Sequence, residues 1–413
     1  MHVVAVADFD VATLILGGLL VLGALLSGLA HRSFLSLTAL FVVAGFALGR
    51  GGFGVLELDP RSGFVHDLAT VALIVILFRD GLEVEAEMLQ TAWRLPLRSL
   101  VVAMPLTAII VAVAARVLVG LDWTAAFLVG ALLSPTDPVL SSSVVTNPRV
   151  PRVVRHSLNL ESGLNDGLAL PAVLAFAAAL GDRQGFVWWH FVLQDVTLGF
   201  AFGLGAGLLA AWALPRSAAI PEHQRSLFAL GVAFATYGIA VLPPAGNGLI
   251  AVFVCAITLG IRRHDVRATF EARSDDIVEV VKLGVFGVFG SLLTLAGLLG
   301  DGWAAVGLVA VTLLVARPVA IGIALLGTRL PPFLKAFIAW FGPKGVATMT
   351  FSLLILADGF PGAERIFNLA ALCVFASILA HGLTDTPGAE WVGARAEAAP
   401  SLGAGSPRRR TAR

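Results

Sequence analysis

The sequence has 413 residues, of which 58% are hydrophobic and 13% are charged, and its formal net charge is +1. Because soluble domains carry about 25% charged residues, this composition excludes a water-soluble enzyme, and a net charge near zero gives no basic field to attract nucleic acid. Several apolar runs approach or exceed the roughly 20 residues that a helix needs to cross a bilayer. The sequence therefore predicts an all-α polytopic membrane protein rather than a β-barrel, whose alternating strand pattern is absent.

Gly, Pro and charge clusters divide the chain into about thirteen predicted membrane spans. In chain order they are expected at 11–30, 34–49, 65–79, 99–119, 124–146, 157–180, 186–214, 226–242, 246–261, 277–299, 302–326, 333–357 and 364–384. The apolar run 226–261 is too long for one span and is split at Pro243 and Pro244. These spans make a membrane domain of residues 1–385, and the Ala-, Gly-, Pro- and Arg-rich remainder predicts a short disordered tail over 386–413.

The distribution of arginine predicts the orientation of the chain. Loops after odd-numbered spans carry most of the loop arginines, namely Arg32, Arg94, Arg98, Arg149, Arg152, Arg155, Arg216, Arg225, Arg262, Arg263, Arg267, Arg273 and Arg329. Loops after even-numbered spans carry Arg50, Arg61 and Arg183. Because cytoplasmic loops are enriched in Lys and Arg, we expect the N-terminus outside, the C-terminus in the cytoplasm, and a multi-pass protein of the cell inner (plasma) membrane.

Five ionisable side chains are predicted to lie at similar depth inside the bilayer. With a rise of about 1.5 Å per helical residue, Asp137 falls near the middle of the fifth span and Asp166 near the middle of the sixth. Glu161 lies one turn closer to the cytoplasm, and Arg317 and Lys344 lie near the middle of the eleventh and twelfth spans. Because a charge at this depth costs several kcal/mol, each is a candidate for function.

Two of these charges lie in segments that cannot be regular helix. The segment 134–138 reads Ser-Pro-Thr-Asp-Pro, and 341–345 reads Phe-Gly-Pro-Lys-Gly. Proline removes a backbone N–H, and its ring clashes with the preceding turn, so both spans are predicted to be broken. Broken helices in the fifth and twelfth spans are typical of a secondary transporter built from inverted six-helix repeats, with the two unwound helices crossing. The alternative is two kinked helices of unrelated origin.

The sixth span carries polar side chains on one face. The i, i+4 spacing places Ser162 and Asp166 together, with Glu161 and Asn165 on the adjoining face. The Asp166 carboxylate, the Ser162 hydroxyl, water and the backbone carbonyls freed near Pro135 and Thr136 can form a small oxygen cage for Na+, Li+ or K+. This cage lacks the nitrogen or sulfur donors that favour a transition metal. For Glu161 and Ser162 the alternative is capping of a helix start.

At these residues the chain resembles the sodium/proton antiporters of the NhaP type, relatives of the eukaryotic sodium/hydrogen exchangers. The resemblance runs over roughly residues 10–385, and its most specific parts are the Thr-Asp-Pro of 136–138 and the Glu-Ser and Asn-Asp pairs at 161–162 and 165–166. It implies a secondary active transporter that exchanges a monovalent cation for protons, with no cofactor, as a homodimer in the lipid bilayer. It further implies a scaffold of spans 1–3 and 8–10, a linking span 7, and a moving core of spans 4–6 and 11–13.

The resemblance assigns roles to individual residues. Asp166 resembles the aspartate that binds the ion and the proton, with Ser162 and the Thr136 carbonyl as further ligands. Asp137 resembles the aspartate that balances the helix ends at the crossing. Glu161 and Arg317 resemble a buried ion pair between spans 6 and 11. Asn165 stands where electrogenic relatives carry another acid, which implies electroneutral exchange.

The chain departs from the family pattern at two positions. The third span of the family often ends in Phe-acid-Gly-Gly, whereas this chain has Phe-Arg-Asp-Gly-Leu at 78–82, so an acid in the cytoplasmic funnel would be Asp80. Relatives frequently carry Arg where Lys344 stands. Because the charge state of a lysine responds readily to burial, Lys344 is not assumed to be inert in the proton cycle.

The expected mechanism needs one carboxyl group that holds either a proton or a cation. Burial disfavours the charged form of Asp166, and moving an empty charge through lipid is costly, so access should change only when the site is occupied. The rival functions are a channel, which would conduct without proton coupling, and an intramembrane enzyme that uses Asp137 and Asp166 as a carboxylate pair.

Overall fold

The protein is described here by a computed structural model, which covers residues 13–14, 17–18, 21, 37–84, 93–137, 144, 147–182, 185–214, 221–243 and 246–398. The side chains at 222–223 and 271–275 are not described. Within these ranges every regular element is a helix and there is no strand, which confirms the predicted all-α class.

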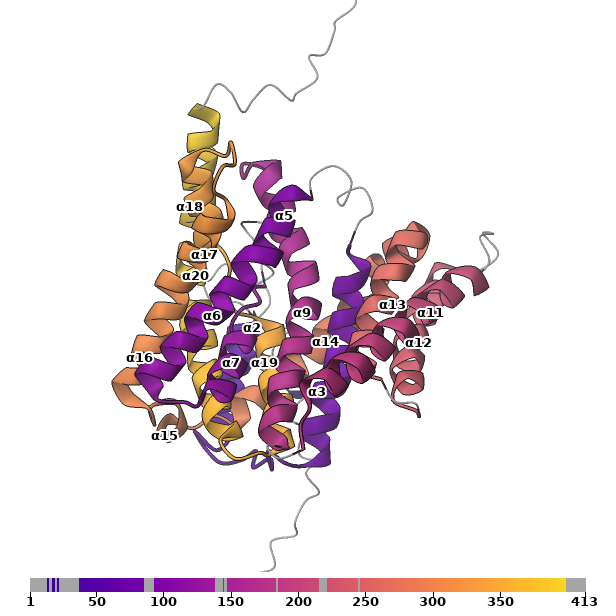
Figure 1. Cartoon of the computed structure of the whole chain (residues 1–413), viewed down its shortest axis with the longest axis horizontal. Helices are drawn as coiled ribbons and strands as arrows, with labels where there is room; N and C mark the ends of the chain where they lie inside the picture. Colours follow the sequence, from indigo (N-terminus) through magenta and orange to yellow (C-terminus); the bar gives the residue numbers. More distant parts are fainter. Residues whose placement is uncertain are drawn as a thin grey trace, which may run out of the picture.

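Figure 1 shows the helices as they follow one another along the chain. Their bounds are α2 (Leu37–Leu48), α3 (Gly63–Leu82), α5 (Arg94–Arg98), α6 (Met104–Ala114), α7 (Trp123–Leu132), α9 (Arg152–Gly181), α10 (Trp188–His190), α11 (Thr197–Ala213), α12 (Glu222–Ala240), α13 (Gly248–Arg262), α14 (His264–Ser291), α15 (Leu295–Leu298), α16 (Gly302–Val311), α17 (Arg317–Ala324), α18 (Pro332–Trp340), α19 (Val346–Asp358) and α20 (Ala363–Ala398). From the second span onward, each predicted span coincides with one or two of these helices, and the first lies largely outside the described residues.

Five helical segments of the described chain are long and apolar enough to cross a bilayer. They are Arg94–Val119, Arg152–Gly181, Trp188–Ala213, Gly302–Ala324 and Ala363–Ala398. Shorter apolar helices cover Ala39–Leu48, Trp123–Leu132, Gly248–Arg262 and Val346–Asp358. The helical membrane architecture is therefore as predicted, while the count of thirteen crossings stays a prediction.

Two of the long helices contain a π-helical stretch just before a proline. The stretch η1 (Ser99–Ala103) precedes Pro105, and η5 (Thr312–Ala316) precedes Pro318. A proline inside a helix removes one hydrogen bond and crowds the carbonyl four residues earlier, and a wider π turn relieves that crowding. The helices therefore continue through their prolines instead of ending there.

The last helix extends further than the sequence predicted. Residues 386–398 continue α20, and Pro387 lies inside it, so the prediction of a disordered tail from 386 is wrong for this stretch. Ala389 and Val392 are buried in an apolar cluster with Phe337 and Phe341, and this packing outweighs the low helix propensity of the local composition. The rest of the predicted tail, residues 399–413, lies outside the described residues.

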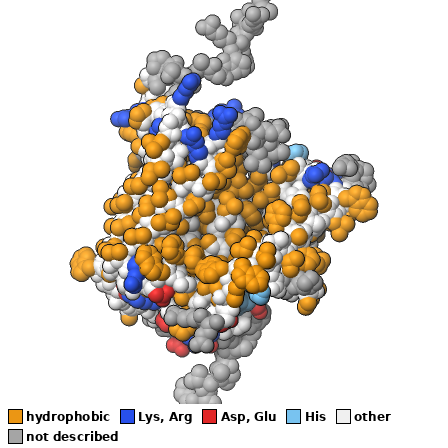
Figure 2. Space-filling view, viewed as in Figure 1, with side chains coloured by type: hydrophobic (Ala, Val, Ile, Leu, Met, Phe, Trp, Pro, Cys, Tyr) orange, Lys and Arg blue, Asp and Glu red, His pale blue; other side chains and the backbone are white. Residues whose placement is uncertain are grey.

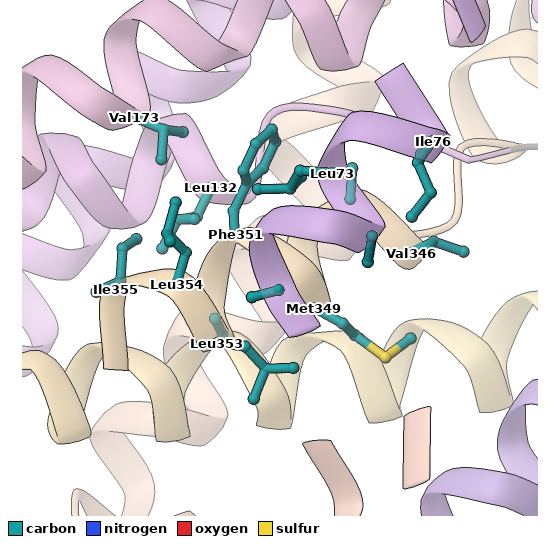
Figure 3. Packing of buried hydrophobic residues seen from close by; sticks show 14 of the residues in the cluster. Leu73, Ile76, Leu132, Val173, Val346, Met349, Phe351, Leu353, Leu354 and Ile355 are labelled. Carbon is teal, nitrogen blue, oxygen red and sulfur yellow. The ribbon is translucent and has the colours of Figure 1, made fainter. Parts of the chain in front are cut away.

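Helices α9 and α19 occupy the middle of the molecule (Figure 1). Both contact α3, which itself packs against α13 and α14, and both contact α7, which packs against α6. Apolar side chains of α3, α7 and α19 interdigitate there, as Leu73, Leu132 and Phe351 show in Figure 3. The elements predicted to carry function are thus held in the interior of the bundle.

Small residues allow close approach between some of the surrounding helices. A Cβ atom at Gly290 of α14 would meet the carbonyl oxygen of Val42 in α2, and one at Gly207 of α11 would meet the carbonyl oxygen of Cys255 in α13. Helices in lipid associate through such close packing because lipid gives them little hydrophobic drive to associate. The glycine content of the sequence is used here to bring backbones together.

The surface of the molecule is divided along its long helices. Figure 2 shows hydrophobic side chains over the middle of the visible face, with most Lys and Arg side chains toward the end where α5 and α18 lie. Arg94 and Arg98 are exposed in α5, Arg152 is exposed at the start of α9, and Arg329 is exposed between α17 and α18. The exposed arginines at this end belong to loops that the sequence assigns to the cytoplasm, and the orientation of the chain in the membrane stays a prediction.

Candidate functional site: a crossing of two broken helices and an acidic cavity

The two predicted breaks are present and touch each other. Helix α7 ends at Leu132 and residues 134–137 are not helical, while 341–345 separate α18 from α19. The backbone N–H of Asp137 donates a hydrogen bond to the carbonyl of Pro343, with an N···O distance of 2.8 Å. Pro138, the last residue of the first predicted break, lies outside the described residues.

The charges in the two breaks offset the helix ends that face them. The Lys344 ammonium donates to the carbonyl oxygens of Pro135 and Ser134, at 3.2 and 3.5 Å, just beyond the C-terminal end of α7. The Asp137 carboxylate accepts from the N–H of Val346, the first residue of α19, at 3.3 Å. A cation at a helix C-terminus and an anion at an N-terminus are both favourable. Each buried charge is therefore stabilised by the opposite helix.

Replacing Lys344 with Met is expected to lower the free energy of unfolding by about 1 to 3 kcal/mol, because hydrogen bonds from a charged donor and its interaction with a helix end are lost. Thermal unfolding in detergent measures this loss. Lys335→Met is the matched control, since Lys335 is half-buried and donates one hydrogen bond, to Thr328. An equal loss in both variants would contradict the role of Lys344 at the crossing.

A buried ion pair ties α9 and α17 to both breaks. Arg317 Nη1 lies 2.7 Å from Glu161 Oε1, and both side chains are less than one-tenth exposed. Arg317 Nη2 also donates to the carbonyl of Phe341 at 3.3 Å, and Thr136 Oγ1 lies 3.5 Å from Glu161 Oε1. Gly342 leaves room for this arrangement, because a Cβ atom there would meet the Arg317 guanidinium. The pair therefore organises the crossing and lies behind the cavity described below.

Asn165 also forms hydrogen bonds with the first break. Its Nδ2 donates to the Thr136 carbonyl at 2.7 Å and to Thr136 Oγ1 at 3.1 Å. The carbonyl predicted as a cation ligand is thus already an acceptor for an amide, although a carbonyl oxygen has a second lone pair.

Asp166 lies in a small cavity next to the crossing. The carboxylate is 5% exposed, and its Oδ1 has no hydrogen-bond partner among the described residues. The cavity has a volume of about 60 Å³ and is also lined by Ser162, Asp137 and Asp80, which come from α9, the first break and α3. Four of the predicted site residues therefore meet in one space, whereas Thr136, Glu161, Asn165, Arg317 and Lys344 do not line it.

The cavity has further walls that the sequence analysis did not foresee. Ile76 and Val346, seen near each other in Figure 3, form its apolar side. Arg79 of α3 and Glu83, which directly follows this helix, also line the cavity and form an ion pair with an N···O distance of 3.2 Å. Lys282 of α14 completes the lining and is 6% exposed.

Lys282 is a functional candidate that sequence reasoning missed. It lies near the start of the predicted span 277–299 and therefore not at the mid-membrane depth at which a charge indicates function. The available signal was a single lysine within the apolar run Val-Val-Lys-Leu-Gly-Val at 280–285. It lines the cavity together with Asp80 and Asp166, which places a positive charge in the same small space as both carboxyl groups.

The sequence was compared with models of known protein families. The sequence model for "sodium/hydrogen exchanger, transmembrane" matches residues 18–391. The chain belongs to the sodium/hydrogen exchanger family. The K(+)/H(+) antiporter NhaP of Alkalimonas amylolytica is 25% identical to this chain over 388 residues. The K(+)/H(+) antiporter NhaP2 of Shewanella sp. (strain MR-4) is 28% identical over 394 residues. Each match covers 93% of this chain and 67% of the relative.

The fold has a solved counterpart. The structure of the sodium proton antiporter MjNhaP1 from Methanocaldococcus jannaschii at pH 8 superposes with a TM-score of 0.80 at 19% identity, covering 96% of this chain and 100% of that one. The resemblance inferred from the residues at 136–138 and 161–166 is therefore confirmed. Family membership also confirms the predicted class, a cation/proton antiporter and thus a transporter rather than an enzyme.

Proposed function

We propose that this protein exchanges a monovalent cation for protons across the plasma membrane, with both ligands competing for Asp166. The observation that carries the proposal is the buried Asp166 carboxylate, which has an unpartnered oxygen and faces a cavity beside the crossing. The relatives named above act on K+ and H+ or on Na+ and H+. We take Na+ and K+ as the candidate substrates, with Li+ as a further candidate.

Charge balance around the crossing favours Asp166 as the exchanging group. Asp137 and Lys344 each face an opposite helix end, and Glu161 is paired with Arg317. The negative charge of Asp166 is not matched in this way, so a proton or a cation is needed to neutralise it. Because an empty charged site is costly to move through a low-dielectric region, coupling follows if access changes only in the neutral, occupied state.

The proposed ligand set is the Asp166 carboxylate with the Ser162 hydroxyl, with Asp137 and water completing it in the cavity. Asn165 and the Thr136 carbonyl support this set from behind through their mutual hydrogen bond. An amide at position 165 adds no second proton-binding group on this face of α9. The proposal therefore includes electroneutral exchange of one cation for one proton.

The cavity is proposed to face the cytoplasm. Glu83 follows the C-terminal end of α3, and Asn159, which is exposed, lies in the first part of α9, whose start carries Arg152. Both residues thus belong to the basic end of the bundle, which the arginine distribution assigns to the inside. In this view α3, α13 and α14 belong to a fixed scaffold, and α7, α9, α18 and α19 to a core that moves against it by alternating access, within a homodimer.

Proton flux in proteoliposomes tests the proposal. Vesicles containing the purified protein are given an inward-acid pH gradient, and external Na+, K+ or Li+ is then added while a pH dye reports the lumen. Exchange predicts that at least one of these cations dissipates the gradient and enters the vesicles. A channel would pass the cation without moving protons, and the absence of any cation-dependent proton movement would refute the proposal.

A further inference from the structure

Four acidic and two basic side chains line the cavity. Arg79 and Glu83 form an ion pair with each other and cancel. Asp137 carries a full negative charge, but it belongs to the crossing, where the positive charge of Lys344 and the N-terminal end of α19 balance it. The remaining full charges are those of Asp80, Asp166 and Lys282. When both carboxyl groups are deprotonated, two carboxylates and one ammonium leave the empty cavity with a net charge of about −1.

Lys282 is placed to act on the cavity as a whole. Among the described residues it forms no direct ion pair, but it lines the same small cavity as Asp80 and Asp166. Glu279, one turn earlier on α14, is exposed and does not line the cavity. A lysine that is 6% exposed pays a desolvation cost, which nearby carboxylates can offset. The positive charge of Lys282 therefore contributes to the electrostatic potential inside the cavity and is not used in a surface ion pair.

The donors around this cavity do not by themselves select a monovalent ion. Carboxylate oxygens of Asp80, Asp137 and Asp166, together with the Ser162 hydroxyl, are hard oxygen ligands of the kind that Ca2+ also prefers. Without the ammonium the same cavity would carry a net charge of about −2, which a divalent cation would neutralise. The choice of ion valence must then come from a positive charge in the cavity.

We propose that Lys282 is a specificity-determining residue: as a tethered cation it offsets Asp80, holds the cavity at one net negative charge, and so restricts it to one monovalent cation or one proton. This inference rests on the proposed function and extends it. It assigns Asp80 the role of partner to Lys282 across the space between α3 and α14, in addition to lining the cavity with Asp166.

Lys282→Gln tests the inference by removing the charge while keeping a polar side chain. Equilibrium binding of ⁴⁵Ca2+ to the full-length protein in detergent should be at least about tenfold tighter than for the wild type, since one full charge at short range changes the binding free energy by more than about 1.4 kcal/mol. Ca2+ should also inhibit cation-dependent proton flux in this variant. Lys282→Arg, which keeps the charge, should still exclude Ca2+, and Lys335→Gln is the control for loss of a lysine outside the cavity.

Asp80→Asn tests the same charge balance by removing a negative charge from the cavity instead of a positive one. It leaves one carboxylate and one ammonium, so the affinity for the transported monovalent cation should fall by at least about tenfold. The double variant Asp80→Asn with Lys282→Gln returns the net charge to about −1. It should regain most of the monovalent affinity and lose the gain in Ca2+ binding, which a merely structural role of Lys282 would not produce.

The outcomes of these experiments distinguish a failure of the proposed transport function from a failure of the role assigned to Lys282. If the wild type shows no cation-dependent proton flux, the proposed function fails and this inference fails with it. If the wild type exchanges ions but Lys282→Gln binds Ca2+ no better, or the folded double variant is not rescued relative to Asp80→Asn, only the role of Lys282 is overturned. Should Lys282→Gln fail to fold alone, the comparison of Asp80→Asn with the double variant decides.

Discussion

Replacing Asp166 with Asn is expected to reduce cation-dependent proton flux to the level of protein-free liposomes. The substitution keeps the size of the side chain but removes the only charge of the cavity on α9, so neither a proton nor a cation is needed to neutralise that position. Binding of the transported cation should be lost together with transport. Both are measured in one preparation, by calorimetry in detergent and by the pH dye in proteoliposomes.

The control for this variant is Asp182→Asn. Asp182 follows the same helix at its C-terminal end, is exposed, and accepts a hydrogen bond from the N–H of Gly185. Asp182→Asn makes the same chemical change outside the cavity, so this variant should retain transport. Robust proton flux driven by Na+ or K+ in folded Asp166→Asn would remove Asp166 from the mechanism.

Much of the fold follows from the sequence because lipid imposes a simple rule on it. A backbone that crosses a bilayer must satisfy its own hydrogen bonds, so long apolar runs predict helices and a Gly-Pro or double-proline segment predicts a break. The breaks at 134–137 and 341–345 were foreseen on that basis. The helical stretch 386–398 was not, because its order comes from contacts of Ala389 and Val392 with α18, which composition does not encode.

The sequence predicts which residues belong to the site more readily than it predicts how these residues are arranged in space. Helical spacing places Ser162 beside Asp166, and depth counting brings Glu161 to the level of Arg317. Which charge faces which helix end depends on how two distant segments cross, so the contact of Lys344 with α7 could not be read from local sequence. Lys282 was missed for a related reason: its significance comes from facing acids on α3 and α9, and a single lysine near a span end is usually a solvated one.

Disrupting the buried pair of Glu161 and Arg317 is expected to produce the largest loss of stability. Glu161→Ala leaves the Arg317 guanidinium buried without its carboxylate, and breaking a buried ion pair from one side costs about 3 to 5 kcal/mol. The loss is measured as a lower unfolding temperature and a smaller folded fraction in detergent. The partly exposed pair of Asp301 and Arg365 provides the control, since Asp301→Asn should cost about 1 kcal/mol or less.

A double-variant cycle distinguishes the ion pair from general packing. Arg317→Met alone strands the Glu161 carboxylate, whereas Glu161→Met with Arg317→Met removes both charges and should be more stable than either single variant, because no buried charge is left unpaired. Part of the loss should remain, since Arg317 also binds the carbonyl of Phe341 in the second break. Ion affinity in folded Glu161→Ala should change less than stability, because Glu161 lies behind the cavity and does not line it. Unchanged thermal stability of Glu161→Ala would show that the contact with Arg317 does not hold the crossing together.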